Sequence, residues 1–246
     1  MNLFITLKHL LLVLLGAVFL TGCASDGGYF AGRKPIRVLL VGGGEHHDYN
    51  RWFNAADSAL LTATGKATAA YREPQELTTA EVKDSDVLVI SANKAFPDAA
   101  VRDAIFAHAH AGKGLVLLHP GLWYNWKDWA EYNRVLAGGG SRGHDRYGEF
   151  EVIATEPAHP LMKGVPATFR ISDELYWFEP DPNGTAVQIL ATAHSRQKNQ
   201  AYPQVFIVRH PETRIVGLTL GHDGRAHEHP AFQQLLRNAV FWVARR

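Results

Sequence analysis

Short runs of mostly apolar residues divide the first half of the chain. They occupy residues 36–41, 67–71, 86–91 and 115–119. Runs that are apolar on both faces are typical of buried strands in a parallel sheet. Between them, residues from Asp48 to Gly65 and from Pro97 to about His110 show helical spacing and helix-ending residues. This alternation predicts an α/β fold with helices on both faces of the sheet.

The second half of the chain shows a different pattern. Short runs at residues 148–154, 186–193, 204–209 and 214–220 are separated by turn residues, which predicts an antiparallel extension of the sheet. A last helix is expected from Pro230. Its apolar positions form one stripe that should pack on the sheet, and they are Phe232, Leu235, Leu236, Ala239, Val240 and Trp242.

The N-terminus has the pattern of a bacterial lipoprotein precursor. An apolar run at residues 10–20 follows Lys8 and is too short for a typical membrane span. It ends in Leu20-Thr21-Gly22-Cys23, which resembles a lipobox. We therefore expect a signal peptide at residues 1–22, palmitate and other acyl chains on Cys23, a flexible tether over 23–34 and one domain over 35–246. The alternatives are an ordinary secretory signal or a buried N-terminal helix.

This interpretation also bears on location and on chemistry. Because no Asp follows Cys23 directly, resemblance to sorting rules favours the outer membrane, facing the periplasm, over the inner membrane. The formal net charge of +1, without a run of Lys or Arg, gives no basic surface for nucleic acid. Cys23 is the only cysteine, so the expected domain has neither a disulfide nor a cysteine nucleophile.

Several of the thirteen histidines follow predicted strands. His46 and His47 come after the first strand, His119 after the fourth, and His222 after a late one. Ligands of open α/β sheets bind beyond the carboxyl ends of the strands, so these loops could share one rim. Imidazole can act there as base, acid or metal ligand, although a single loop histidine is more often a surface residue. A metal site would have to be assembled from separate loops.

Acidic and aromatic residues supply further candidates. Asp173 and Glu174 stand beside aromatic residues, where a carboxylate could act as a base, orient an imidazole, bind sugar hydroxyls or only cap a turn. Trp123 and Tyr176 could stack on sugar rings, but a loop packed on its own domain would have the same composition.

Five sequence blocks together resemble the ThuA-like (trehalose utilisation) family. They are Gly-Gly-Gly44-Glu-His-His47, Gly-Leu-Val-Leu-Leu-His119, His159-Pro-Leu-Met-Lys-Gly164, Asp173-Glu174-Leu-Tyr176 and Leu220-Gly221-His222-Asp223. The resemblance implies a flavodoxin-like, class I glutamine amidotransferase-like fold, a doubly wound, mostly parallel sheet. Glutaminases need an activated cysteine at the strand-to-helix elbow, which here is His119-Pro120-Gly121. Without that cysteine, glutamine amidotransferase chemistry is excluded.

What the family implies is carbohydrate metabolism, with isomerase, lyase or hydrolase chemistry on glycosides or keto-sugars and a sugar oxidoreductase as a partner. The residues carried over for catalysis are His46, His119, Glu174 and His222, and those for substrate binding are Trp123, Tyr176, Asp173 and Asp223. A divalent metal, if used, would be held by His46, His119 and His222. The chain departs from the family at Ile171-Ser172, where a further histidine is common. The alternatives are a lipid-anchored sugar-binding protein without catalysis and a structural envelope protein.

Overall fold

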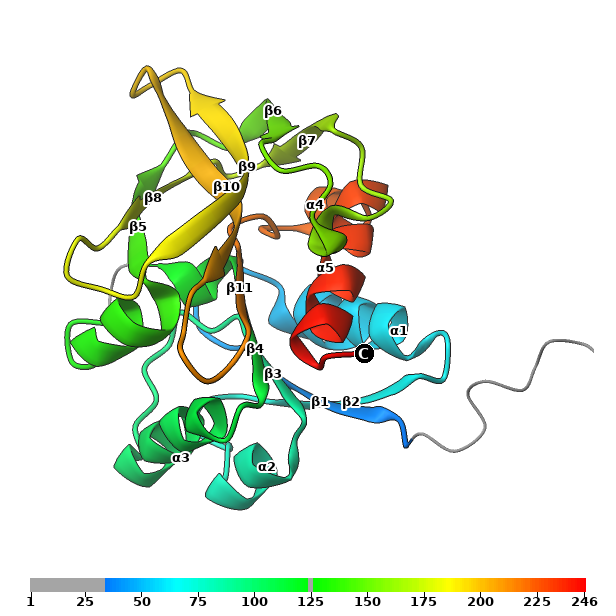
Figure 1. The fold of residues 1–246 in the computed structure, drawn as a ribbon, viewed down its shortest axis with the longest axis vertical. Coiled ribbons are helices and arrows are strands. Elements are labelled where there is room, and N and C mark those ends of the chain that lie inside the picture. The colour runs from blue at the N-terminus through cyan, green and yellow to red at the C-terminus, as the bar shows by residue number, and fades with distance from the viewer. Residues whose placement is uncertain (1–33, 124–125) are drawn as a thin grey trace, which may run out of the picture. The chain divides into compact units, whose positions relative to one another are not determined.

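Nine strands form one sheet in the computed structural model, which describes residues 34–123 and 126–246 (Figure 1). Their order is β2-β1-β3-β4-β11-β10-β9-β6-β7. The first five strands run parallel to one another. They are β2 (Ala67–Arg72), β1 (Ile36–Val41), β3 (Val87–Ile90), β4 (Gly114–Leu118) and β11 (Ile215–Leu218).

The remaining four strands form the expected antiparallel extension, and two more pair separately. The extension consists of β10 (Gln200–Val208), β9 (Val187–Ser195), β6 (Gly148–Ala154) and β7 (Thr168–Asp173). The separate pair is β5 (Gly139–His144) with β8 (Tyr176–Pro180). Strand β11 was expected in the extension, but it runs parallel to β4 and antiparallel to β10, so it joins the two halves.

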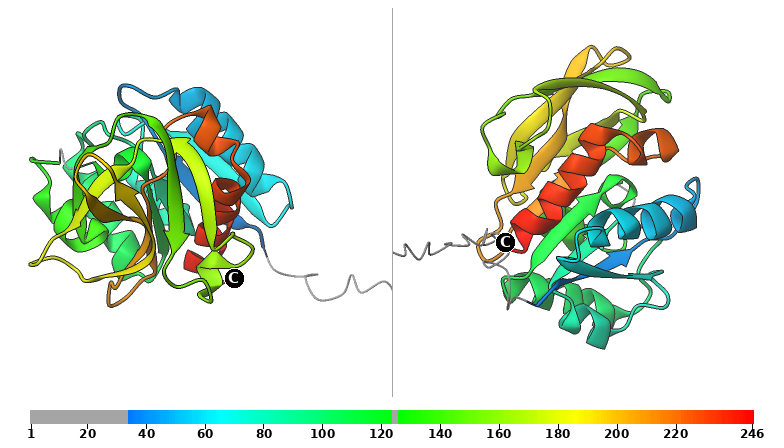
Figure 2. Two further views of the ribbon diagram at one scale, coloured as in Figure 1. Left: turned by 90° about the horizontal axis from the view of Figure 1, so that it is seen from above. Right: turned by 90° about the vertical axis from the view of Figure 1, so that its right-hand side faces the viewer.

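Helices cover both faces of the parallel strands (Figures 1 and 2). Helices α1 (Asp57–Thr62) and α5 (Pro230–Val243) pack on one face, and α2 (Thr79–Asp84) and α3 (Ala99–His110) pack on the other. Alternate residues of β1 divide between the two resulting cores, as the period of a strand requires. The α/β fold with a doubly wound, mostly parallel sheet is confirmed.

The first helix differs from an ordinary helix at its start. Asp48 caps it by accepting a hydrogen bond from the Arg51 amide, as predicted, but residues Tyr49–Ala56 wind as a π-helix before α1 begins at Asp57. Such wider turns are frequently found at functional sites. A short helix, α4 (Gly224–His227), follows β11 and lies next to the last helix.

The predicted signal peptide, the lipidated Cys23 and the predicted tether up to residue 33 lie outside the described residues. From Lys34 to Arg246 the chain forms one compact unit. Within residues 34–123 and 126–246, none of the helices combines the length and the apolar character needed to cross a membrane.

Candidate functional site

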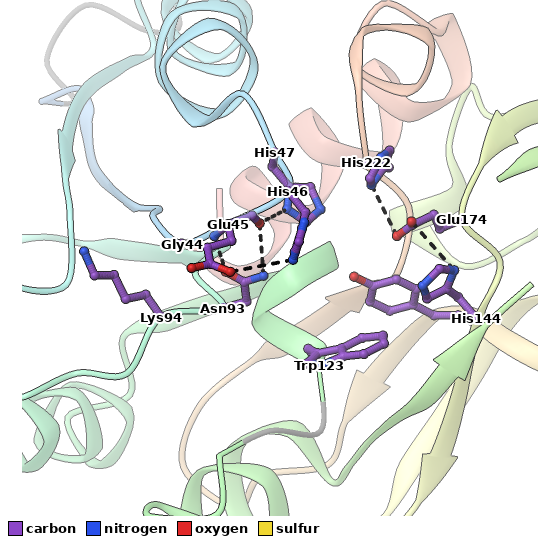
Figure 3. A pocket seen from close by; sticks show the side chains of 11 residues that line it. Gly44, Glu45, His46, His47, Asn93, Lys94, Trp123, His144, Glu174 and His222 are labelled. Atoms are coloured by element: carbon purple, nitrogen blue, oxygen red, sulfur yellow. Dashed lines mark hydrogen bonds and ion pairs between the residues drawn. The ribbon is translucent and has the colours of Figure 1, made fainter. Parts of the chain in front are cut away.

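The loops after four neighbouring parallel strands bring polar residues to one site, where His47, Asn93 and His222 line a cavity (Figure 3). His47 follows β1, Asn93 follows β3, His119 follows β4 and His222 follows β11. The cavity measures about 1020 Å³ and opens beyond the carboxyl ends of these strands, as expected for an open α/β sheet. Its lining consists of Gly44, Glu45, His46, His47, Asn93, Lys94, Trp123, His144, Glu174, Tyr176 and His222.

Three imidazoles and one carboxylate converge at the inner wall of this cavity. His47, His119, His222 and Glu174 each place one nitrogen or oxygen within 4.8 Å of the others. The Glu174 Oε2 atom lies 3.2 Å from His222 Nδ1 and 3.7 Å from His119 Nε2. Glu174 reaches this position from the short turn between β7 and β8.

Backbone carbonyls fix two of these rings. His119 Nδ1 lies 2.6 Å from the Thr219 carbonyl, and His47 Nδ1 lies 3.0 Å from the Glu45 carbonyl. Because a carbonyl can only accept, each Nδ1 carries the proton and donates it. In the neutral form of either ring, the Nε2 atom therefore holds a free lone pair.

The nitrogens that face the carboxylate are buried and lack hydrogen bonds. His47 Nε2, His119 Nε2 and His222 Nδ1 have no hydrogen-bond partner among the described residues. Leaving a buried polar group unpaired costs about 1–3 kcal/mol. His119 Nε2 and His222 Nδ1 have only their ionic contacts with Glu174, and His47 Nε2 has no hydrogen bond, so this arrangement requires an explanation. Histidines that bind metals almost always donate their other ring N–H to a carbonyl, carboxylate or water, as His47 and His119 do here.

The pKa values of the clustered side chains shift in different directions. Burial, together with the charge of His119, lowers the pKa of His47 to about 3. Burial alone would raise the pKa of Glu174, but its contacts with His119 and His222 outweigh burial and hold that pKa well below its usual range. Burial opposes protonation of His222, yet the Glu174 carboxylate raises its pKa. At neutral pH the site thus has an ionised carboxylate and a neutral His47.

His119 occupies the predicted strand-to-helix elbow in a strained conformation. Its backbone φ is +39°, a value uncommon for a residue with a side chain. The elbow packs so tightly that a Cβ at Gly121 would lie 2.2 Å from the Ile90 carbonyl oxygen. The side chain of His119 is completely buried, and Tyr176 stacks on its ring with centroids 4.3 Å apart.

The structure places His47, and not His46, in this cluster. His46 has a backbone φ of +71°, and its side chain is 79% exposed at the cavity mouth, with Glu45 as its ionic neighbour. The structure therefore brings His47 together with His119 and His222, whereas His46 lines the outer part of the same cavity. The left-handed turn at His46 aims the next side chain inward.

Asp173 and Asp223 do not line the cavity. The Asp173 carboxylate is fully buried and accepts hydrogen bonds from the backbone amides of Glu174, Gly221 and His222, at 2.7, 2.7 and 3.1 Å. It ties the Glu174 turn to the His222 loop and is not accessible to a substrate. Asp223 caps α4 by accepting from the Arg225 amide.

Trp123 and Tyr176 do line the cavity, as expected, and their rings contact each other edge to face at 5.4 Å. One face of Tyr176 is occupied by His119, so Trp123 is the better placed of the two to stack on a ligand. Burial raises the pKa of the Tyr176 hydroxyl well above its ordinary value, so this group remains a donor.

Sequence reasoning also missed His144 and Asn93. His144, at the end of β5, places Nδ1 3.7 Å from Glu174 Oε1, but the glycine-rich strand before it shows no strand pattern. Asn93 accepts from Tyr49 Oη at 3.0 Å and from the Glu45 amide at 3.2 Å, so it holds the His47 loop. The position of Asn93 directly after a buried strand could have identified it as a candidate site residue.

Fold and site together define an α/β protein with a histidine–carboxylate cluster at the strand ends and a histidine at the elbow. The model of the ThuA family, described as trehalose utilisation, matches residues 37–243. The chain belongs to this family, and membership indicates a carbohydrate-related function. A comparison with curated protein sequences finds no match.

Solved structures agree with the fold. A ThuA-like protein from Parabacteroides merdae is 23% identical with a TM-score of 0.74, over 86% of this chain and 90% of that one. A ThuA-like protein from Bacteroides uniformis is 18% identical with a TM-score of 0.73, over 89% and 95%. A GMP synthase protein from Thermoplasma acidophilum is 12% identical with a TM-score of 0.58, over 87% and 96%. The last similarity agrees with a glutamine amidotransferase-like fold.

Proposed function

We propose that the protein is an enzyme of carbohydrate metabolism that binds a divalent cation through His47, His119, His222 and Glu174. One observation carries this proposal: three buried imidazole nitrogens without hydrogen bonds, two of them in ionic contact with Glu174, converge on this one ionised carboxylate. Imidazole nitrogens and carboxylate oxygens are ligands of zinc and of other first-row divalent metals, so these four side chains form a suitable ligand set. Family membership supports glycosides or keto-sugars as the substrates.

Three residues of the site have different proposed roles in the reaction. The low pKa of Glu174 makes it a weak base, so it serves as a ligand and orients the imidazoles. His144 lines the open cavity with a one-third exposed side chain and is placed to move a proton on a bound substrate. The protonated Tyr176 hydroxyl can donate to a substrate oxygen.

A bound cation would polarise a carbonyl and stabilise an enolate next to it. A keto-sugar offers such a carbonyl beside an acidic C–H bond, and removal of that proton begins isomerase or lyase chemistry. A hydrolase is the third possibility within the proposal. The three are separated by the products that they form.

Cation binding is tested with matched variants of neighbouring histidines. His110, His210 and Glu212 also bring three ligand atoms together, at a different place in the chain, so the measurements use a His110→Gln background. Zinc titration of the purified protein should give one tight site, which His47→Ala weakens more than tenfold and the exposed His46→Ala leaves unchanged. The absence of a tight site, or equal effects of the two variants, would contradict the proposal.

Turnover is tested with a panel of disaccharides and their keto forms. Glu174→Gln and His119→Ala should abolish conversion, because each removes one of the four groups at the inner wall. The Trp123 ring on the cavity wall favours a second candidate, a sugar-binding protein without catalysis. That candidate requires a sugar-dependent thermal shift without conversion, and Trp123→Ala should then abolish the shift.

We also propose that the domain is held at the cell envelope, on the outer membrane facing the periplasm, through acylated Cys23. The lipobox-like Leu20-Thr21-Gly22-Cys23 supports this. In that compartment a sugar oxidoreductase would supply the keto-sugar.

A further inference from the structure

Two titratable residues are buried together behind the site. His227 Nδ1 lies 2.8 Å from Asp57 Oδ1, and both residues are at most 2% exposed. The second carboxylate oxygen, Asp57 Oδ2, has no hydrogen-bond partner among the described residues. Neither residue lines the cavity. A buried pair of this kind contributes little to stability compared with apolar residues, so its presence calls for another reason.

The pair controls one backbone carbonyl. His227 Nε2 lies 3.1 Å from the carbonyl oxygen of Gly221. Because this carbonyl can only accept, Nε2 must carry a proton. Asp57 at the opposite nitrogen enforces that arrangement whether the shared proton lies on oxygen or on nitrogen.

That carbonyl belongs to the peptide group that joins Gly221 to His222. The N–H of the same peptide group donates to Asp173 Oδ1 at 3.1 Å. The peptide is therefore held on one side by His227 and on the other by Asp173. This double contact fixes the backbone direction from which the His222 side chain reaches Glu174.

The pair also contacts the other ligand-bearing loop. Phe53, in the π-helix, packs edge to face on His227 with centroids 4.6 Å apart. The same ring meets His47 edge to face at 5.9 Å. Asp57 follows one helical turn after Phe53, so one segment supports both His47 and His222.

We propose that Asp57 and His227 are positioning residues that hold His222, and through Phe53 also His47, in the geometry that binds the cation. This inference rests on the proposed function. The two residues touch neither the cavity nor a substrate and act only through the loops that they hold.

Two variants that differ by one methylene group test the role. In His227→Gln the side-chain amide can reach the Gly221 carbonyl, whereas in His227→Asn it is too short. His227→Asn should weaken zinc binding about 10–100-fold, as loss of an outer contact to a ligand does, and His227→Gln should stay within about threefold of the parent. In Asp57→Asn the side-chain amide can donate to the unprotonated Nδ1 of His227 while Nε2 keeps its proton for the Gly221 carbonyl, so zinc binding should also stay close to the parent. In Asp57→Leu it should not.

The control is His108→Asn. His108 is equally buried and contacts the carbonyls of Val82 and Gly114, but it packs with α3 on the face of the sheet opposite α1 and α5. The His108→Asn variant should have a lower melting temperature and an unchanged zinc affinity. If His227 had only a structural role, His227→Asn should behave in the same way. A folded His227→Asn that binds zinc within twofold of the parent overturns the inference. If His227→Asn does not fold, the Asp57→Leu and Asp57→Asn pair decides by the same criterion.

A second measurement separates this inference from the proposed function. If the parent protein binds no zinc, the proposed function fails. Hydrogen exchange of the Gly221 and His222 amides then reports the positioning alone. Exchange should accelerate at least tenfold in His227→Asn and not in His227→Gln, and equal rates in the two variants overturn the inference.

Discussion

Replacement of Asp173 by asparagine tests whether one buried carboxylate joins the two loops of the site. Its Oδ1 atom accepts from the amides of Glu174 and His222, and its Oδ2 atom accepts from the amide of Gly221. Asparagine preserves the shape but has only one acceptor oxygen. With that oxygen at the Oδ1 position, the new NH₂ group faces the Gly221 N–H, and donor meets donor.

The size of the effect follows from these three contacts. One buried N–H loses its partner, which costs about 1–3 kcal/mol, and the two remaining bonds change from charge-assisted to neutral, each weaker by roughly 1 kcal/mol. Relief from burying a charge offsets part of this loss. We expect Asp173→Asn to lower the free energy of unfolding by about 2–4 kcal/mol. For a domain of this size the melting temperature should fall on the order of 10 °C.

Thermal and urea unfolding measure this change, with Asp223→Asn as the matched control. Asp223 receives a single backbone N–H at the start of α4, and asparagine caps helices as well as aspartate does. The control should therefore stay within about 0.5 kcal/mol of the parent. If Asp173→Asn behaves like the control, the carboxylate does not hold the loops and the reasoning is refuted.

Three further predictions concern the loop of His47, a buried histidine and the N-terminus. Gly44→Ala should destabilise the protein by about 1–3 kcal/mol and weaken zinc binding in a titration, because the new Cβ would lie 1.6 Å from Asn93 Oδ1. The control is Gly65→Ala, where a Cβ meets no atom within 4 Å, and zinc binding should be unchanged. Burial lowers the pKa of His108 to about 4, so the unfolded chain binds the extra proton between pH 4 and 6.5 and stability falls as the pH drops through this window. In urea unfolding at several pH values, His108→Gln should remove at most roughly 3 kcal/mol of that fall, and an unchanged pH profile contradicts the assignment. Cys23→Ser should abolish palmitate labelling and release the protein from the membrane fraction, and retention of both would refute the lipid anchor.

Strands β1, β3 and β4 of the parallel half were predictable because they are almost completely buried on both faces. Such strands are continuous apolar runs, and residues 86–91 contain the observed β3 (Val87–Ile90). Strand β5 was not predictable, since Gly-Gly-Ser-Arg-Gly-His pairs with β8 through its backbone and carries no alternation. The π-helix before α1 was also not predictable, because its two buried residues, Tyr49 and Phe53, are four positions apart, a spacing that an α-helix shares.

The candidate site was predictable to the level of loops and not of single side chains. Placement after a strand identified the loops of His119 and His222 from the sequence. The choice between His46 and His47 depends on one left-handed backbone angle, which residue type does not specify. Asp173 is the last residue of β7, so its neighbour Glu174 points in a different direction, and only one of these adjacent carboxylates can face the cavity.

The elbow shows how this fold separates position from chemistry. A φ of +39° at a residue other than glycine costs of order 1–3 kcal/mol and persists only where its surroundings enforce it. Here Thr219 holds the ring of His119, Tyr176 stacks on it, and Gly121 lets the turn pass against β3. The backbone would therefore direct any side chain at this corner toward the strand ends. At this corner the imidazole of His119 lies 3.7 Å from Glu174, where the proposed cation would bind.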